Sequence, residues 1–189
     1  MDSSDVQSLL RANINAATEH LENLGPQLAT AADLVTGSLR AGHQVLACGN
    51  GGSAADAAHL VTELVGRYEH ERRPYAAVCL NDSGAAMSAI SNDYGFDHVF
   101  ARQVRALGHS GDVLIVLSTS GRSPNVRMAL EAAVEMKLTS IAFLGRDGGD
   151  SKGIATVDLI APGNRTPRIQ EAHKLLYHTL CELIEHDLK

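Results

Sequence analysis

The sequence contains no tryptophan, and phenylalanine and tyrosine bring its aromatic content to only 4% of 189 residues. A hydrophobic core must therefore be built mainly from leucine, valine, isoleucine and alanine. Basic residues are also scarce, with 16 lysines and arginines against 22 acidic residues and a formal net charge of −6. A general nucleic-acid-binding protein needs a basic surface to displace counterions. The composition argues against that class, although it leaves room for a local basic pocket that binds an anion.

Cysteine is rare as well, and Cys48, Cys79 and Cys181 are odd in number, far apart and each in an apolar run. This pattern is typical of reduced thiols in the core of a cytosolic protein, and not of a disulfide framework or a zinc ribbon. The first ten residues lack the basic and apolar regions of a signal peptide. No apolar run approaches the roughly 20 residues needed to cross a bilayer. We therefore expect a cytoplasmic protein with no membrane partner.

Two amphipathic helices are predicted before any strand. Apolar residues recur at spacings of three and four over residues 5–24, and again from Leu28 to Gly42, a good C-terminal stop. Pro26 either ends the first helix or begins the second. Because helices outside a sheet often serve association, we expect residues 1–41 to be a helical extension used in oligomerisation.

The rest of the chain alternates between strands and helices. Apolar segments predict strands at 43–49, 75–80, 112–118, 139–145 and 156–161. Helical patterns occupy 53–67, 84–91, 96–107, 124–136 and 166–187. Strands that are apolar on both faces and separated by helices indicate a parallel sheet covered on both sides. We predict one α/β domain over residues 1–189, a three-layer doubly wound sheet whose ligand binds beyond the carboxyl ends of the strands.

The first predicted strand ends in the glycine-rich turn Gly49-Asn50-Gly51-Gly52-Ser53. Glycine lets the backbone approach a ligand closely, and the following helix presents unpaired N–H groups. The run also fits a dinucleotide fingerprint, which requires an acidic residue about 20 positions further on. The second strand ends only at Asn81-Asp82, so a nucleotide site is a weaker alternative, as is a tight turn without a ligand.

The turn after the third predicted strand is rich in hydroxyl groups and reads Ser118-Thr119-Ser120-Gly121-Arg122-Ser123-Pro124. Pro124 suits the first position of a helix, which makes Ser123 the expected N-cap. Hydroxyls and backbone donors at a helix N-terminus form a phosphate cradle that needs neither a Walker lysine nor a metal. The alternative is a serine-rich turn with one capping serine.

Acid–base groups are predicted on two helices. His59, Glu63 and Arg67 follow one another at spacings of four, which places them on one helix face. His59 and Glu63 could share a proton or a metal, or the face could be solvated with a Glu63–Arg67 pair.

The last helix carries Gln170, Glu171, His173 and His178. Gln170 and His178 are separated by about 12 Å of helix, so a site using both is completed by another subunit or spans the two ends of a substrate. His178 could alternatively be a buried structural histidine.

Long motifs in order along residues 5–187 resemble one family. They are GNGGSAADAAHLVTELVGRY, SNDYGF, LSTSGRSPNV, GRDGG and RIQEAHKLLYH, and they are similar to those of the sedoheptulose-7-phosphate isomerases, or phosphoheptose isomerases, of the SIS fold. The resemblance implies acid–base roles for Glu63 and His178. It implies substrate contacts from Asn50, Gly51, Gly52, Ser53, Glu63, Asn92, Asp93 and Gln170, and phosphate contacts from Ser118, Thr119, Ser120 and Ser123.

The resemblance also implies a cofactor and an assembly. His59, Glu63, Gln170 and His178 match positions that bind zinc in some members, which are homotetramers with active sites at subunit interfaces. The implied reaction converts sedoheptulose 7-phosphate to D-glycero-D-manno-heptose 7-phosphate, the first step toward nucleotide-activated heptose. Ala54 and Pro167 depart from residues found in some members, which weakens the transfer of fine substrate contacts.

Two alternatives share this fold. One is a non-catalytic relative that binds the bacterial replication initiator DnaA, a branch that lacks the glutamate and the second histidine of the acid–base pair. The other is a domain that senses a sugar phosphate without converting it. Because this chain retains Glu63 and His178, the isomerase interpretation is favoured.

Overall fold

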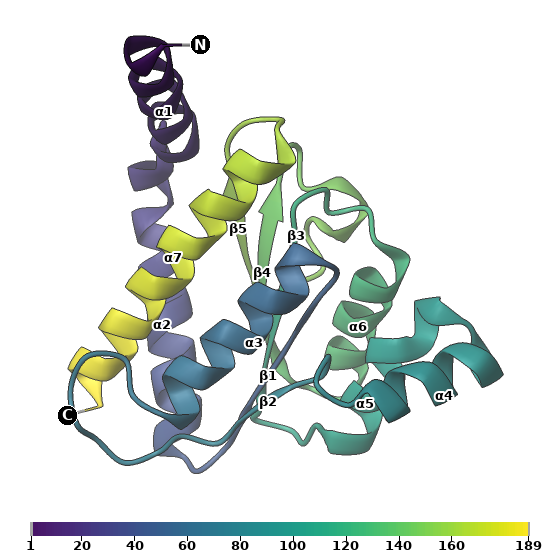
Figure 1. Ribbon diagram of the computed structural model, residues 1–189. Helices are drawn as coiled ribbons and strands as arrows, with labels where there is room; N and C mark the ends of the chain where they lie inside the picture. The colour runs from purple at the N-terminus through teal and green to yellow at the C-terminus, as the bar shows by residue number, and fades with distance from the viewer. Residues whose placement is uncertain (1, 189) are drawn as a thin grey trace.

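The computed structural model describes residues 2–188 and contains a five-stranded parallel sheet (Figure 1). The strand order is β2-β1-β3-β4-β5. The strands are β1 Val45–Gly49, β2 Ala77–Cys79, β3 Val113–Ser118, β4 Thr139–Gly145 and β5 Val157–Ala161. Each neighbouring pair is parallel, which confirms the predicted sheet. The strand order reverses between β1 and β3, the position at which such sheets bind ligands.

Helices cover both faces of the sheet (Figure 1). The longer helices are α1 Ser3–Thr18, α2 Gly25–Arg40, α3 Gly52–Val65, α4 Gly84–Tyr94, α5 Val99–Leu107, α6 Pro124–Glu135 and α7 Thr166–Asp187. Short 3₁₀ turns lie at Leu21–Leu24, Phe96–His98 and Gly149–Ser151. Apolar residues of α2, α3 and α7 form one core layer and those of α5 and α6 form the other. The predicted three-layer arrangement is therefore confirmed.

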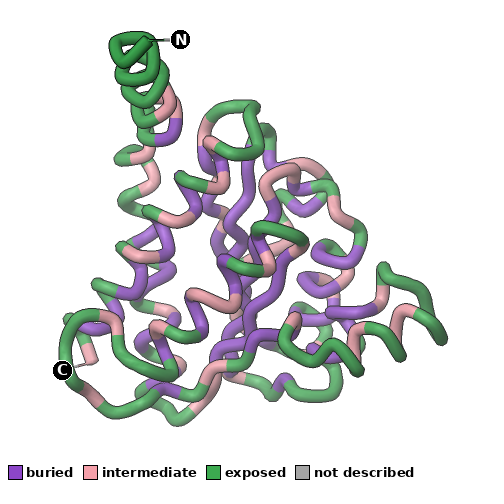
Figure 2. The backbone as a smooth tube through the Cα atoms, viewed as in Figure 1, coloured by how far each residue is buried: buried purple, intermediate pink, exposed green. Residues whose placement is uncertain are grey.

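The side chains of β3 show why the strands read as continuous apolar runs. Ile115 and Leu117 belong to the layer under α3 and α7, whereas Leu114 and Val116 belong to the layer under α5 and α6. Successive residues of a strand point to opposite faces, and both faces are covered here. Figure 2 shows the central strands β1, β3 and β4 buried along nearly their whole length, whereas the edge strands β2 and β5 are partly exposed. No helix among residues 2–188 is long and apolar enough to span a membrane.

The N-terminal region differs from the expected helix over residues 5–24. α1 ends at Thr18, His20 adopts a positive φ of 59°, and a 3₁₀ turn leads into α2. Pro26 lies in the first turn of α2, where its missing N–H would have had no helical partner. α1 extends from the body of the molecule and is exposed over much of its surface (Figures 1 and 2).

Candidate active site

A small polar cavity lies where the sequence predicted a phosphate cradle. Its volume is about 80 Å³, and its lining comes from the loops after β1 and β3. These loops meet because β1 and β3 are adjacent parallel strands whose carboxyl ends share one edge of the sheet. The lining residues are Asn50, Ser53, Leu117, Ser118, Thr119, Ser120 and Ser123. The structure thus brings most of the predicted polar residues of both loops around one cavity.

Backbone geometry explains the glycines of these loops. Gly51 adopts φ 58° and ψ −120° as the N-cap of α3, a conformation that disfavours residues with a side chain. Gly121 has φ 63°, and a Cβ built on it would lie 1.9 Å from the carbonyl oxygen of Gly148. The second loop can therefore pack against Gly148 only because residue 121 has no side chain.

The hydroxyl groups of the cradle are free to donate hydrogen bonds to a ligand. Ser123 is the N-cap of α6 as predicted, but its side chain makes no capping hydrogen bond. The Ser118 and Ser120 hydroxyls accept from the backbone N–H groups of Gly121 and Arg122. Within residues 2–188, no hydrogen bond is donated by the hydroxyls of Ser118, Thr119, Ser120 or Ser123. Donors of this kind at a helix N-terminus suit a phosphate group.

A pair of asparagines joins the turn after β1 to the first turn of α6, and no local sequence pattern indicated this contact. Asn50 Nδ2 donates to Asn125 Oδ1 at 2.9 Å, and Asn125 Nδ2 donates to Asn50 Oδ1 at 3.0 Å. Asn125 is buried. This reciprocal pair fixes the turn after β1 relative to the first turn of α6, so it holds the two walls of the cavity together.

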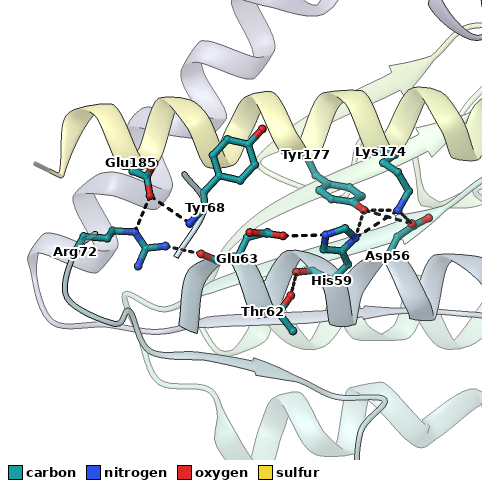
Figure 3. Close-up of polar contacts among 9 residues, drawn as sticks. All are labelled: Asp56, His59, Thr62, Glu63, Tyr68, Arg72, Lys174, Tyr177 and Glu185. Atoms are coloured by element: carbon teal, nitrogen blue, oxygen red, sulfur yellow. Dashed lines mark hydrogen bonds and ion pairs between the residues drawn. The ribbon is translucent and has the colours of Figure 1, made fainter. Parts of the chain in front are cut away.

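The acid–base residues form a second cluster, between α3 and α7. His59 Nε2 lies 2.8 Å from Glu63 Oε1, and the rings of His59 and His178 are 5.1 Å apart. One ligand atom from each of His59, Glu63 and His178 lies within 4.8 Å of the others. Figure 3 shows the contact between His59 and Glu63 along α3. The two helices therefore bring together residues that are far apart in the sequence.

The structure does not form the Glu63–Arg67 pair that the spacing left open as an alternative. α3 ends at Val65 with Gly66 as its C-cap, so Arg67 does not continue the face that carries Glu63. The guanidinium of Arg67 instead donates to the carbonyl of Glu69 at 3.1 Å. Glu63 is left with His59 as its partner, and its side chain is 19% exposed.

The surroundings of His178 favour its neutral form. Burial lowers the pKa of its imidazole, and His59 and Lys174 lower this pKa further against the opposing charges of Glu63 and Asp56. A neutral imidazole can donate from one nitrogen and accept at the other. His178 lines a groove of about 600 Å³ between α1 and α7, so it is reachable from outside the chain.

His173 is the buried structural histidine of α7. It has no exposed surface, and its Nε2 lies 2.8 Å from the carbonyl oxygen of Leu144 in β4. Burial lowers the pKa of this imidazole. A buried structural histidine was the alternative considered for His178, and His173 is the residue of α7 that fits this description.

Gln170 contacts the first turns of α3, near the cradle. Its Nε2 donates to Asp56 Oδ2 at 3.1 Å, and its amide lies over Gly52, at the position that a Cβ there would occupy. Gln170 lies about two helical turns before His178 on α7, as expected from their separation in the sequence. Its role as a metal ligand stays a prediction.

Asn92 and Asp93 lie at the end of α4, which has no buried residue and projects from the body of the molecule (Figure 1). Both side chains are exposed, and Asn92 Nδ2 donates to Asp93 Oδ1 at 2.9 Å. Neither residue lines the cradle cavity. Their substrate role stays a prediction.

The cluster of α3 and α7 also fits a zinc ion. Two imidazole nitrogens and a carboxylate oxygen are donors that zinc prefers, and three protein ligands are typical of a catalytic zinc site. The mutual distances of up to 4.8 Å require only small side-chain movements to meet one ion.

Comparison with known proteins gives consistent matches. The family model described as SIS domain matches residues 11–145. A phosphoheptose isomerase of Geobacter sp. (strain M21) is 47% identical over 97% of this chain and 96% of its own length.

Two solved structures match over nearly their whole length. The phosphoheptose isomerase of Neisseria gonorrhoeae is 45% identical with a TM-score of 0.88, and covers 97% of this chain and 98% of its own. The phosphoheptose isomerase of Francisella tularensis is 37% identical with a TM-score of 0.92, and covers 98% of this chain and 100% of its own.

Proposed function

The chain belongs to the phosphoheptose isomerase family of SIS-domain proteins, and from this premise we propose that it isomerises sedoheptulose 7-phosphate to D-glycero-D-manno-heptose 7-phosphate. This aldose–ketose isomerisation is the first step toward nucleotide-activated heptose. The observation that carries the proposal is the combination of a hydroxyl-lined cradle with an acid–base cluster of His59, Glu63 and His178. A phosphate-binding site alone would serve a sensor equally well.

The chemistry needs two kinds of proton transfer. Moving a carbonyl from C2 to C1 through an enediol requires a base that carries a proton between the carbons, and a group that exchanges protons with the oxygens. We assign the first role to the Glu63 carboxylate, which His59 holds by a hydrogen bond. We assign the second to His178, because a neutral imidazole can donate to one oxygen while it accepts from another. The cradle hydroxyls bind and orient the phosphate.

Zinc is proposed as a cofactor held by His59, Glu63 and His178, with Gln170 as a further ligand supplied after rearrangement or from another chain. When bound, zinc would polarise the substrate carbonyl. Protein purified without a polyhistidine tag is expected to contain about one zinc per chain, and His59→Gln is expected to reduce that content. Full activity in chelator with little metal by elemental analysis would reject a catalytic metal.

The distance between the cradle and Glu63 within one chain favours an active site that two chains share. Ser53 lines the cradle and Glu63 follows ten residues later on the same helix, a separation of about 15 Å at 1.5 Å per residue. An extended sugar phosphate held in the cradle hardly reaches Glu63 of the same chain. We therefore propose a homotetramer in which neighbouring chains complete each site. In this proposal residues 1–189 form one cytoplasmic SIS domain, and residues 1–41 mediate association.

An apolar stripe on α1 supports this assembly. Val6, Leu9, Leu10 and Ile14 are each about half exposed, which is typical of a surface that another chain covers. Leu10→Glu is expected to shift sedimentation velocity toward smaller species, because a charge in a covered apolar contact is unfavourable. Ser8→Glu adds the same charge to the other side of α1 and serves as the control. A monomeric wild-type protein would refute the shared site.

The reaction itself is tested with purified protein and sedoheptulose 7-phosphate. We expect an aldoheptose phosphate to appear until equilibrium, as followed by NMR or by chromatography of the two phosphates. Absence of product under these conditions would reject the isomerase function and favour a sensing or partner-binding role. The named relatives are isomerases, so the DnaA-binding alternative is not favoured.

A further inference from the structure

The turn that connects β1 to α3 is held from two sides by asparagine side chains that the proposed function does not use. The turn covers residues 49–53 and includes Asn50 and Ser53, which line the cradle cavity. It leads directly into α3, since the backbone N–H of Ser53 already donates to the carbonyl of Asn50 at 3.0 Å. A displacement of this turn therefore moves one wall of the cradle.

On one side the turn is held by Asn125, in the first turn of α6. The amides of Asn125 and Asn50 exchange two hydrogen bonds, at 2.9 and 3.0 Å. Asn125 is only 2% exposed, and within residues 2–188 its side chain has no other hydrogen-bond partner. Each amide is both donor and acceptor for the other, so neither can turn over alone without setting two oxygens or two N–H groups face to face. The pair therefore fixes the orientation of the Asn50 side chain.

On the other side the turn is held by Asn81, the second residue after β2. The last residue of β1 that pairs with β2 is Ala47, whereas β1 continues to Gly49. The Asn81 side chain accepts from the N–H of Gly49 at 3.2 Å and donates to the carbonyl of Gly49 at 2.9 Å. One side-chain amide thus supplies the hydrogen bonds that a longer β2 would have made, and it fixes the start of the turn.

Neither of the two supporting asparagines contacts the space that the ligand would occupy. The cavity is lined by Asn50, but not by Asn81 or Asn125. Asn125 reaches the cavity only through Asn50, and Asn81 reaches it only through the backbone of Gly49. Both amides are uncharged. An effect of either residue on ligand binding must therefore arise from the position of the turn, and not from direct contact or charge.

We propose that Asn125, assisted by Asn81, is a positioning residue for phosphate binding: the two side chains hold the turn after β1 so that Asn50 and Ser53 keep their places in the wall of the cradle. This inference rests on the proposed function and deepens it by naming residues that set the affinity of the cradle. Loss of one hydrogen bond to a charged group typically reduces affinity roughly 10–100-fold.

Asn125→Ala is the direct test, because it removes both hydrogen bonds to Asn50 and leaves every residue that lines the cavity unchanged. We expect KM for sedoheptulose 7-phosphate to rise about tenfold with little change in kcat, because phosphate binding contributes equally to the ground state and the transition state. Asn81→Ala should raise KM less, since water can replace a side chain at this partly exposed position. Wild-type KM in Asn125→Ala would overturn the proposal.

Leu130→Ala is the control for a general loosening of α6. Leu130 is buried on the same helix, in the core layer under α5 and α6. Its truncation leaves a cavity in that layer but removes no contact with the turn after β1. We expect the Tm of this variant to fall while KM keeps its wild-type value. If Leu130→Ala raised KM as much as Asn125→Ala does, the effect would come from stability, and the positioning role would be rejected.

A double variant tests whether Asn125 acts through Asn50. Asn50→Ala is itself expected to raise KM, because Asn50 lines the cradle. If the role of Asn125 is to hold Asn50, then Asn50→Ala combined with Asn125→Ala should have the KM of Asn50→Ala alone, since residues in contact are not additive. Increases in KM that multiply in the double variant would show independent action and would contradict the proposal.

Binding of inorganic phosphate separates this inference from the proposed function, because it requires no turnover. In calorimetric titrations the Kd for inorganic phosphate should be about tenfold higher for Asn125→Ala than for the wild-type protein. An unchanged Kd would overturn the positioning role, even in a fully active isomerase. If the wild-type protein does not convert sedoheptulose 7-phosphate, the proposed function fails, and the phosphate titration still decides the role of Asn125.

Discussion

Replacement of Glu63 by glutamine is expected to reduce kcat by roughly 10²–10⁴-fold, the usual contribution of a general acid or base. Glutamine has the size of glutamate but cannot carry a proton between C1 and C2. The glutamine amide can keep the contact that Glu63 Oε1 makes with His59 Nε2 at 2.8 Å. The arrangement of α3 should survive, and KM should change little because the cradle is untouched. Steady-state kinetics with sedoheptulose 7-phosphate gives both constants.

The matched control is Glu131→Gln, an equivalent change on α6 where Glu131 pairs with Arg127 at the surface. It should retain wild-type kinetics. His178→Gln is expected to lose activity to a similar degree, and the double variant should lose much less than the product of the two effects, because residues acting as a unit are not additive. Undiminished product formation by both single variants would disprove the acid–base assignment.

The largest expected effect on stability comes from Glu185, near the end of α7. This carboxylate is 3% exposed and accepts from the backbone N–H groups of Tyr68, Glu69 and His70 at 2.9–3.2 Å. Arg72 Nε lies 3.4 Å away. Figure 3 shows Glu185 between Arg72 and Tyr68. One side chain thus attaches the segment after α3 to the C-terminal helix.

Arg72 extends this attachment to the catalytic helix. Its guanidinium donates to the carbonyl of Leu64 at 2.9 Å and also to the carbonyl of Glu63. These are among the last carbonyls of α3, which have no partner within the helix. The contacts explain why α3 can end at Val65 with its final turn still hydrogen-bonded.

Glu185→Gln is therefore expected to destabilise the fold by about 3–5 kcal/mol, since removing one partner of a buried ion pair leaves the other charge unpaired. For a chain of this size the Tm should fall by roughly 6–20 °C, at about 2–4 °C per kcal/mol. Calorimetry must compare equal protein concentrations because association affects Tm. Glu182→Gln, at an exposed position of the same helix, should leave Tm unchanged. A Glu185→Gln Tm equal to that of wild type would refute the attachment.

The same contact predicts a pH dependence. Burial alone would raise the pKa of Glu185, but the three backbone N–H groups and Arg72 together lower this pKa below its usual value. A depressed pKa in the folded state means that the contribution is complete above the unfolded pKa of about 4.3 and is lost as pH falls through the folded value. The difference in Tm between wild type and Glu185→Gln should therefore be largest near neutral pH and shrink in acid.

Local patterns predicted much of this protein. The apolar runs indicated all five strands, and the turns at Asn50 and Ser118 indicated the cradle, because strand periodicity and turn composition depend on neighbouring residues. Other features depend on packing. Glu63 pairs with His59 and not with Arg67, since the end of α3 is shaped by Gly66 and by Arg72 from the following loop.

The contacts of Lys174 with Asp56 and Tyr177, between α3 and α7, could not be inferred from spacing. Tyr177 and His59 are 118 residues apart, and no local pattern specifies which face of α7 meets α3. The same holds for the Asn50–Asn125 pair, whose members are 75 residues apart and join the turn after β1 to the first turn of α6.

By itself, the sequence determined the parallel sheet, the two ligand-facing turns and the residue types of the acid–base pair, because these follow from short-range periodicity and from chemistry that each residue carries alone. The tertiary structure decided which of those residues meet. Packing of α7 against α3 brings His178 beside His59 and Glu63 and sets Gln170 against Asp56. Hydrogen-bond direction and shared burial arise only when side chains from distant segments occupy the same space.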